Sequence, residues 1–259
     1  MPLWRRHRRS APRLSPQEQA DTWQLCSLLL DYPQPRLLER LPVLREVVSA
    51  LPTETGAPLG LFLDHLAATD LGLVQQDYVD TFDVTRRCAL HLTYFLHGDT
   101  RKRGVALVQF KQLYRQHGVE LAEGDDAGEE LPDYLPVVLE FGATVAPEAA
   151  WKLLNDHRVG IELLRRALLR RDSPWAPVLQ ALRATLPELE GDDSAALARL
   201  IAQGPPQETV GLDDSTLNAP YAIDPALEEV TRGGPPAAAC GAADTQHPLG
   251  PTIPVGAPR

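Results

Sequence analysis

The chain has 259 residues with 44% hydrophobic content, enough for one sizeable core. Its 25 basic residues against 35 acidic ones give a formal charge of -10, which argues against a general affinity for nucleic acid and favours a basic or apolar partner. The three cysteines lie far apart and form no CxxC pair, so they suggest neither a disulfide framework nor a cysteine zinc site, and a reducing cytoplasm fits best.

Residues 1–14 form a basic segment that differs from an export signal. It carries five arginines, but no apolar run follows them. We therefore expect a disordered basic arm. The sequence has no run of about 18 uninterrupted apolar residues, so no membrane span is predicted.

The chain after this arm has helical patterns. Ser15 with Glu18 three residues later is the signature of a capped start, and this helix is expected to run to about Asp31. Pro42 is expected to divide or kink the next helix, because proline removes a helical hydrogen bond. Apolar spacing extends the helical prediction over residues 37–51, 58–69 and 72–84.

The stretch from Phe95 to Gly118 predicts a helix with an unusual start. Asp99 is interpreted as the N-cap and Gly118 as the residue just past the C-terminal end. Three cations, Arg101, Lys102 and Arg103, then occupy the first turn. Positive charge is unfavourable there by about 0.3 to 1 kcal/mol per charge, so other groups must compensate it.

Two explanations for these cations remain open. The first is an ion-pair cluster that joins three helices, with the carboxylates of neighbouring segments as partners. The second is a surface for a ligand or partner. The candidate carboxylates are Asp80, Asp83, Asp133 and Glu140.

The remaining chain predicts more helices and then a tail. The helical patterns cover residues 131–145, 147–171, 175–186 and 194–203. No segment alternates long enough for a confident strand, so the predicted fold class is all-α, with one helical domain over residues 15–203. Residues 204–259 contain seven glycines and ten prolines, which predicts a largely disordered, acidic tail.

Common catalytic and binding motifs are missing from the sequence. The segment HGDTRKRG at 97–104 lacks the GxxxxGK[ST] pattern of a phosphate loop, and the histidines show no HExxH spacing. We therefore predict no metal site and no enzyme. Residues 86–115 carry seven basic groups and one Asp, which leaves an RNA or nucleotide-binding module as an alternative, although seven acids follow within residues 120–133.

Three runs carry a family resemblance: DYVDTFDVTRRCALHLTYFLHGDTRKRG at 77–104, ALVQFKQLY at 106–114 and ELPDYLPVVLEF at 130–141. They resemble the NarJ-type nitrate reductase assembly chaperones of the TorD and DmsD superfamily of redox-enzyme maturation chaperones. The match is close over residues 78–141 and extends as a helical layout over about residues 15–204.

This resemblance implies an all-helical cytoplasmic chaperone. Its partner would be the catalytic subunit of respiratory nitrate reductase, recognised through an N-terminal segment before cofactor insertion and membrane docking. The molybdenum cofactor and iron–sulfur clusters would belong to that client, and this chain would hold no cofactor. Proteins of cofactor biosynthesis remain open as further partners, and another molybdoenzyme remains open as the client.

The resemblance also implies a set of family-motif and peptide-binding residues. In the second motif, Tyr134 stands where the family usually has His, which puts any imidazole role in doubt but leaves a hydrogen-bonding or packing role. We expect an apolar groove between helices with acids at its rim. The candidate residues are Tyr78, Phe82, Asp83, Arg86, Arg87, Leu90, Tyr94, Asp99, Arg101, Arg103, Asp133, Tyr134, Pro136 and Glu140.

Overall fold

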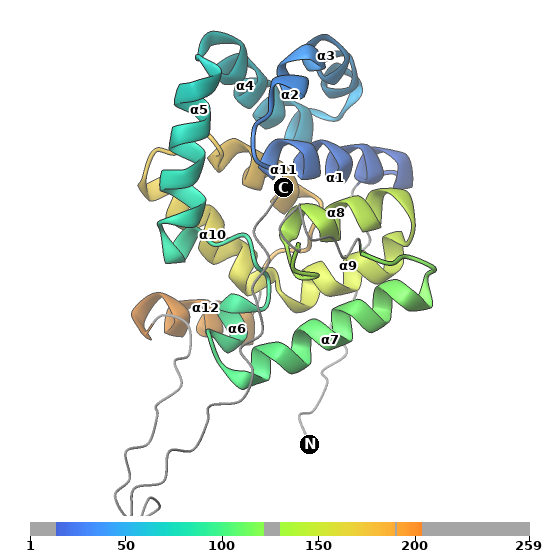
Figure 1. The fold of residues 1–259 in the computed structure, drawn as a ribbon, viewed down its shortest axis with the longest axis vertical. Helices are drawn as coiled ribbons and strands as arrows, with labels where there is room; N and C mark the ends of the chain where they lie inside the picture. Colours follow the sequence, from blue (N-terminus) through green and yellow to red (C-terminus); the bar gives the residue numbers. More distant parts are fainter. Residues whose placement is uncertain (1–13, 122–129, 190, 204–259) are drawn as a thin grey trace, which may run out of the picture. The chain divides into compact units, whose positions relative to one another are not determined.

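The computed structural model describes residues 14–121, 130–189 and 191–203, and these residues are helical, with one isolated β-bridge and no strand (Figure 1). The all-α prediction is therefore confirmed for this part of the chain. The predicted tail, and the predicted arm apart from residue 14, lie outside the described residues. Among the described helices, none combines the length and apolarity needed to cross a bilayer.

Residues 14–121 contain seven short or medium helices, one π-helical turn and one 3₁₀ turn. Ser15 and Glu18 form the predicted capping box, with the Glu18 amide 3.2 Å from the Ser15 hydroxyl. The elements are α1 (Pro16–Leu30), α2 (Pro35–Glu39), α3 (Leu41–Ala50), α4 (Thr53–Ala68), α5 (Leu71–Tyr78), a π-helical turn (Val79–Asp83), a 3₁₀ turn (Arg86–Cys88), α6 (Tyr94–His97) and α7 (Arg101–Gln116).

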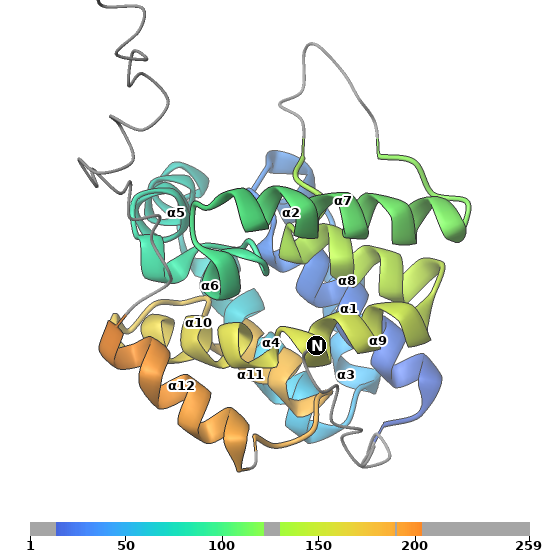
Figure 2. The ribbon, with the colours of Figure 1, turned by 90° about the horizontal axis from the view of Figure 1, so that it is seen from below.

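The second half completes the bundle. Its helices are α8 (Leu135–Thr144), α9 (Pro147–Asp156), α10 (Arg158–Arg170), α11 (Ala176–Ala184) and α12 (Asp192–Gln203). α1 packs against α8 and α11, α11 packs against α4 and α10, and α12 packs against α10. Figure 2 shows α7 and α12 on opposite sides of this arrangement.

Several boundary predictions are confirmed and others are wrong. The chain breaks at Arg40, just before Pro42, as expected. The predicted helix 147–171 is instead two helices that meet at His157. The predicted helix 72–84 changes to a π-helical turn after Tyr78, where the Val84 amide bonds the Val79 carbonyl five residues back.

The core surrounds two buried tryptophans. Trp23 donates its indole N–H to the Thr185 hydroxyl at 2.9 Å, and Trp175 donates to the Leu29 carbonyl at 3.1 Å. Buried polar groups must be paired in this way to avoid a desolvation cost. The two bonds therefore fix α11 and the segment before it against α1.

Gly142 allows α8 to approach its neighbours closely. A Cβ atom at this position would lie 2.5 Å from the Ala150 Cβ and 2.7 Å from the Trp23 ring. Only glycine fits where α1, α8 and α9 meet. This close contact sets the position of α8, which carries part of the candidate site.

Candidate functional site

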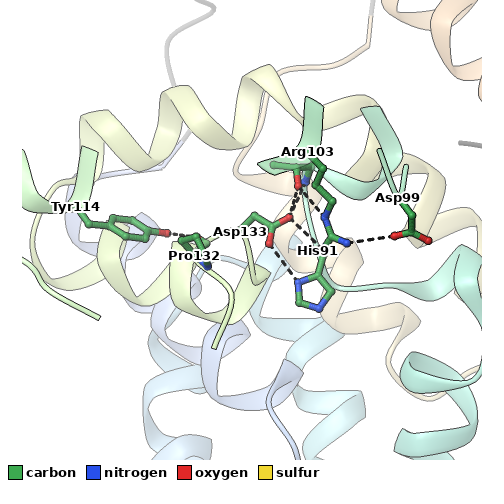
Figure 3. A network of polar contacts seen from close by, with 7 residues as sticks. His91, Asp99, Arg103, Tyr114, Pro132 and Asp133 are labelled. Carbon is green, nitrogen blue, oxygen red and sulfur yellow. Dashed lines mark hydrogen bonds and ion pairs between the residues drawn. The ribbon is translucent and has the colours of Figure 1, made fainter. Parts of the chain in front are cut away.

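Asp133 is the centre of a polar network that joins the segment before α8 to the segments around α6 and α7 (Figure 3). Its side chain is fully buried. One carboxylate oxygen, Oδ2, accepts from the Thr93 amide at 3.1 Å and the Thr93 hydroxyl at 2.5 Å. The other, Oδ1, lies 3.3 Å from His91 Nδ1.

Arg103 connects this network to the start of α7. Its Nη2 lies 3.9 Å from Asp133 Oδ2, and its Nε donates to the Thr93 hydroxyl at 3.3 Å. On its outer side, Nη1 lies 3.4 Å from Asp99 Oδ1, and the guanidinium carbon is 5.9 Å from the centre of the Tyr94 ring. One cation of the first turn is thus compensated by two carboxylates.

The network determines the protonation of Asp133. Burial alone would raise the pKa of this carboxyl, but the adjacent His91 imidazole and the hydrogen bonds from Thr93 lower its pKa below the ordinary value. Asp133 is therefore ionised at neutral pH. Backbone bonds hold the same region in place, since the Leu92 amide donates to the Asp133 carbonyl and the Leu135 amide to the Leu90 carbonyl.

The structure contains one pair of the predicted ion-pair cluster, Arg103 with Asp133, and it adds Asp99 as a second carboxylate beside Arg103. Asp83 and Glu140 are exposed. Arg101 is exposed in the first turn of α7. The N-cap is Thr100 and not Asp99, because Asp99 turns its carboxylate toward Arg103.

Tyr78 and Tyr134 form a second group, which links the two family motifs. Their hydroxyl oxygens are 2.9 Å apart, and the Tyr78 hydroxyl donates to the Leu30 carbonyl at 3.0 Å. Burial raises the pKa of both phenols, so both stay protonated. The Tyr78 and Phe82 rings lie 5.6 Å and 5.4 Å from the Trp175 ring.

Tyr134, which stands where the family usually has His, has a hydrogen-bonding role: its hydroxyl bonds that of Tyr78 in the other motif. An imidazole still lies beside Asp133, but it belongs to His91, which pairs with Tyr134 in the isolated β-bridge. Sequence reasoning missed His91 because it was one of several scattered histidines. It also missed Thr93, a residue with no motif signal.

The remaining predicted residues are not in one place. Arg86 and Arg87 are exposed on the 3₁₀ turn. Leu90 is buried, and Pro136 is the second residue of α8, where its carbonyl accepts from the Ser27 hydroxyl at 2.8 Å. These two shape the interior and offer nothing to a ligand.

A groove lies between the C-terminal part of α7 and the outer face of α8. Its cavity of about 260 Å³ is bounded by Tyr114 and Val119 on one side and by Phe141 and Val145 on the other, with Glu140 at its edge. Tyr114 is fixed there, since its hydroxyl donates to the Pro132 carbonyl at 2.6 Å. Further lining residues are Leu121, Val137 and Thr144.

Negative charge gathers beside this groove. Glu130 has a raised pKa because of partial burial and the nearby carboxylates of Asp31 and Glu140. Asp31 and Glu140 therefore each repel Glu130, and a cation bound near Glu130 would relieve that repulsion. In the described part of the chain, no set of His, Cys, Asp and Glu side chains is arranged to hold a metal ion.

Comparison with known proteins gives a family match, a much longer relative and a relative of similar extent. Residues 49–181 match the family model described as nitrate reductase delta subunit. The nitrate reductase-like protein NarX of Mycobacterium tuberculosis is 40% identical over 63% of this chain, which spans only 24% of that protein. The nitrate reductase molybdenum cofactor assembly chaperone NarJ of Escherichia coli is 33% identical over 79% of this chain and 81% of its own length.

Two more likenesses are weaker or shorter. A probable NarJ chaperone of Bacillus subtilis is 31% identical over 64% of this chain and 88% of that protein. A crystal structure of a redox enzyme maturation protein from Archaeoglobus fulgidus aligns with a TM-score of 0.48 and 20% identity, over 68% of this chain and 97% of that one, which is too distant to add weight. The family match and the NarJ relatives show that the chain belongs to the nitrate reductase delta subunit family.

Proposed function

We propose that this protein is an assembly chaperone, not an enzyme, for a nitrate reductase, acting before the molybdenum cofactor is inserted. The observation that carries the proposal is that a NarJ chaperone matches four fifths of both chains, 79% of this one and 81% of its own length. The proposed client is the catalytic subunit, and the proposed location is the cytoplasm. Cofactor and clusters would be held by the client.

The finer proposal is that the groove between α7 and α8 receives the client's N-terminal segment. A cavity of about 260 Å³ is too small for a whole helix but admits anchoring side chains from one face of it. Apolar anchors would contact Phe141 and Val145, and basic residues would lie near Glu140 and Glu130. Ordering a flexible segment costs free energy, which keeps affinity moderate and allows release.

The Asp133 network would support this site without touching the peptide. It joins the start of α7 to the segment that leads into α8, and these two helices carry the groove at their other ends. The Tyr78–Tyr134 bond joins the end of α5 to the start of α8. In this proposal the family motifs are mostly structural.

Co-purification tests the proposal. Cells would express the nitrate reductase subunits with a tagged form of this chain, with and without the first residues of the catalytic subunit. We expect the full catalytic subunit to be captured, the truncated one to be lost, and the molybdenum content of the enzyme to fall when this chain is absent. Equal capture of both forms would contradict the N-terminal site, and unchanged molybdenum would contradict the chaperone role.

The charge distribution gives less support to an RNA or nucleotide module. Arg103 turns toward Asp133, while Arg86 and Arg87 lie on a separate 3₁₀ turn, so these three basic residues do not lie on one helix face. A filter-binding salt series with no retained RNA would remove this alternative. Another molybdoenzyme as client is tested by repeating the co-purification with its subunits.

A further inference from the structure

A second cavity lies away from the groove, between α10, α11 and α12. Its volume is about 370 Å³, within the usual range of roughly 300–1,000 Å³ for small-molecule sites. α12 packs against α10, and Figure 2 shows it at the edge of the bundle on the side opposite α7. Neither the family resemblance nor the proposed function uses this cavity.

Arginines surround one buried carboxylate at the cavity wall. Glu162 accepts from Arg165 Nε and Arg166 Nε at 2.8 Å each, and Arg183 Nε lies 3.9 Å away. Burial opposes ionisation of Glu162, but the bonds from Arg165 and Arg166 lower its pKa below the ordinary value. Three guanidinium groups thus share one negative charge, which leaves local positive charge in excess.

Two of these guanidinium groups line the cavity and keep donors available. Arg166 uses Nε toward Glu162, and Arg183 approaches the same carboxylate only at 3.9 Å, longer than a hydrogen bond. The side chains are 44% and 49% exposed, so a ligand in the cavity can reach them. A guanidinium group presents a planar set of donors that fits a carboxylate or phosphate.

Apolar side chains make up much of the remaining cavity lining. Leu197 and Ile161 are each 3% exposed, and Ile201 and Leu186 also line the cavity. Arg158 holds the wall by donating to the Glu188 carbonyl, and its Nε lies 3.7 Å from Asp193. The Glu188 side chain is exposed, so it can turn away from an anion.

We propose that this cavity is a binding site for a small organic anion, in which an oxyanion contacts Arg166 and Arg183 while an apolar body contacts Ile201 and Leu186. The shared chemistry is a carboxylate or phosphate on a compact apolar group. The site would act independently of peptide binding at the α7–α8 groove, so either proposal can fail without the other.

Calorimetry with simple probes tests this site on the full chain. Phenyl phosphate and benzoate carry both features, inorganic phosphate carries only the charge, and phenol carries only the ring. We expect saturable binding of phenyl phosphate or benzoate, with the tighter one identifying the oxyanion, and at least about tenfold weaker binding of phenol and of inorganic phosphate. Equal binding of phenol, or no binding of any probe, would overturn the proposal.

Variants locate the binding. Arg183→Gln should weaken the tighter probe by about tenfold or more, because a charge-assisted hydrogen bond is lost. Arg199→Gln removes the same charge from an exposed site on α12 that does not line the cavity, and should change affinity less than about twofold. Ile201→Ala should weaken phenyl phosphate but not inorganic phosphate. Equal losses in Arg183→Gln and Arg199→Gln would show non-specific attraction and overturn the site.

Discussion

At the scale of single residues, the buried carboxylate of Asp133 is the most consequential feature. It contacts His91, Thr93 and Arg103 and has no exposed surface. Removing one partner of a buried charged group leaves the others without compensation, and this costs far more than losing an exposed pair. Asp83 and Asp133 are both predicted partners of the first-turn cations, but replacing them should change the free energy of unfolding by different amounts.

Asp133→Ala should lower the free energy of unfolding by about 3 kcal/mol, because Arg103 and Thr93 lose a buried acceptor. Asp83→Ala should change it by less than about 0.5 kcal/mol, since Asp83 is exposed. Urea unfolding followed by circular dichroism measures both. Equal losses in the two variants would show that Asp133 is not the centre of the network.

The lowered pKa of Asp133 also predicts an acid dependence. A carboxyl whose pKa is lower in the folded state stabilises the fold above its unfolded pKa, about 3.9, and that contribution disappears as the pH falls through the folded value. The difference in unfolding free energy between wild type and Asp133→Asn should therefore shrink below about pH 4. Chemical denaturation in a pH series tests this, and a difference that persists unchanged to about pH 2 would contradict it.

At the scale of helices, the sequence predicts helix ends correctly where neighbouring residues alone determine them. The capping box at Ser15 and Glu18 and the stop at Gly118, whose φ is +75°, are visible in the sequence and present in the structure. The break at His157 is not visible there. It redirects α10 so that Gly160 fits against Phe95, where a Cβ atom would lie 2.8 Å from the ring. Contacts between distant segments decide that break.

Part of the candidate site could be predicted from the sequence and part could not. The family motifs identified Asp133, Tyr78 and Tyr134, because their residue types and order are readable in the sequence. The groove could not be located, because its walls come from Val119, Val145 and other ordinary apolar residues of two segments. Only the packing of α7 against α8 turns them into one surface.

Gly142→Ala tests whether close contact between α1, α8 and α9 sets the position of α8. The added methyl group would overlap Ala150 and Trp23, so the free energy of unfolding should fall by about 1–3 kcal/mol. Gly104→Ala is the matched control: nothing lies within 4 Å of its Cβ position, and this helical site should gain about 0.5–1 kcal/mol. Thermal unfolding measures both. Similar effects of the two substitutions would mean that the contact at Gly142 does not constrain α8.

At the scale of the whole molecule, separate regions have separate roles. The tryptophan core and the two hydrogen-bonded motif groups hold the helices, while the acid-edged groove and the arginine-lined cavity lie in different places. The net charge of -10 would favour attraction of a basic segment, as the proposed function requires. Rim acids should mainly set the association rate and salt sensitivity, and apolar anchors the affinity.

Calorimetry with a peptide of the catalytic subunit's N-terminal residues tests the central claim most directly. We predict saturable binding that weakens with salt, at least about fivefold weaker binding to Val145→Ser, and less than about twofold change for Val43→Ser, which alters an exposed valine of α3 away from the groove. Absence of saturable binding at low salt, or equal affinity of all three proteins, would contradict the account.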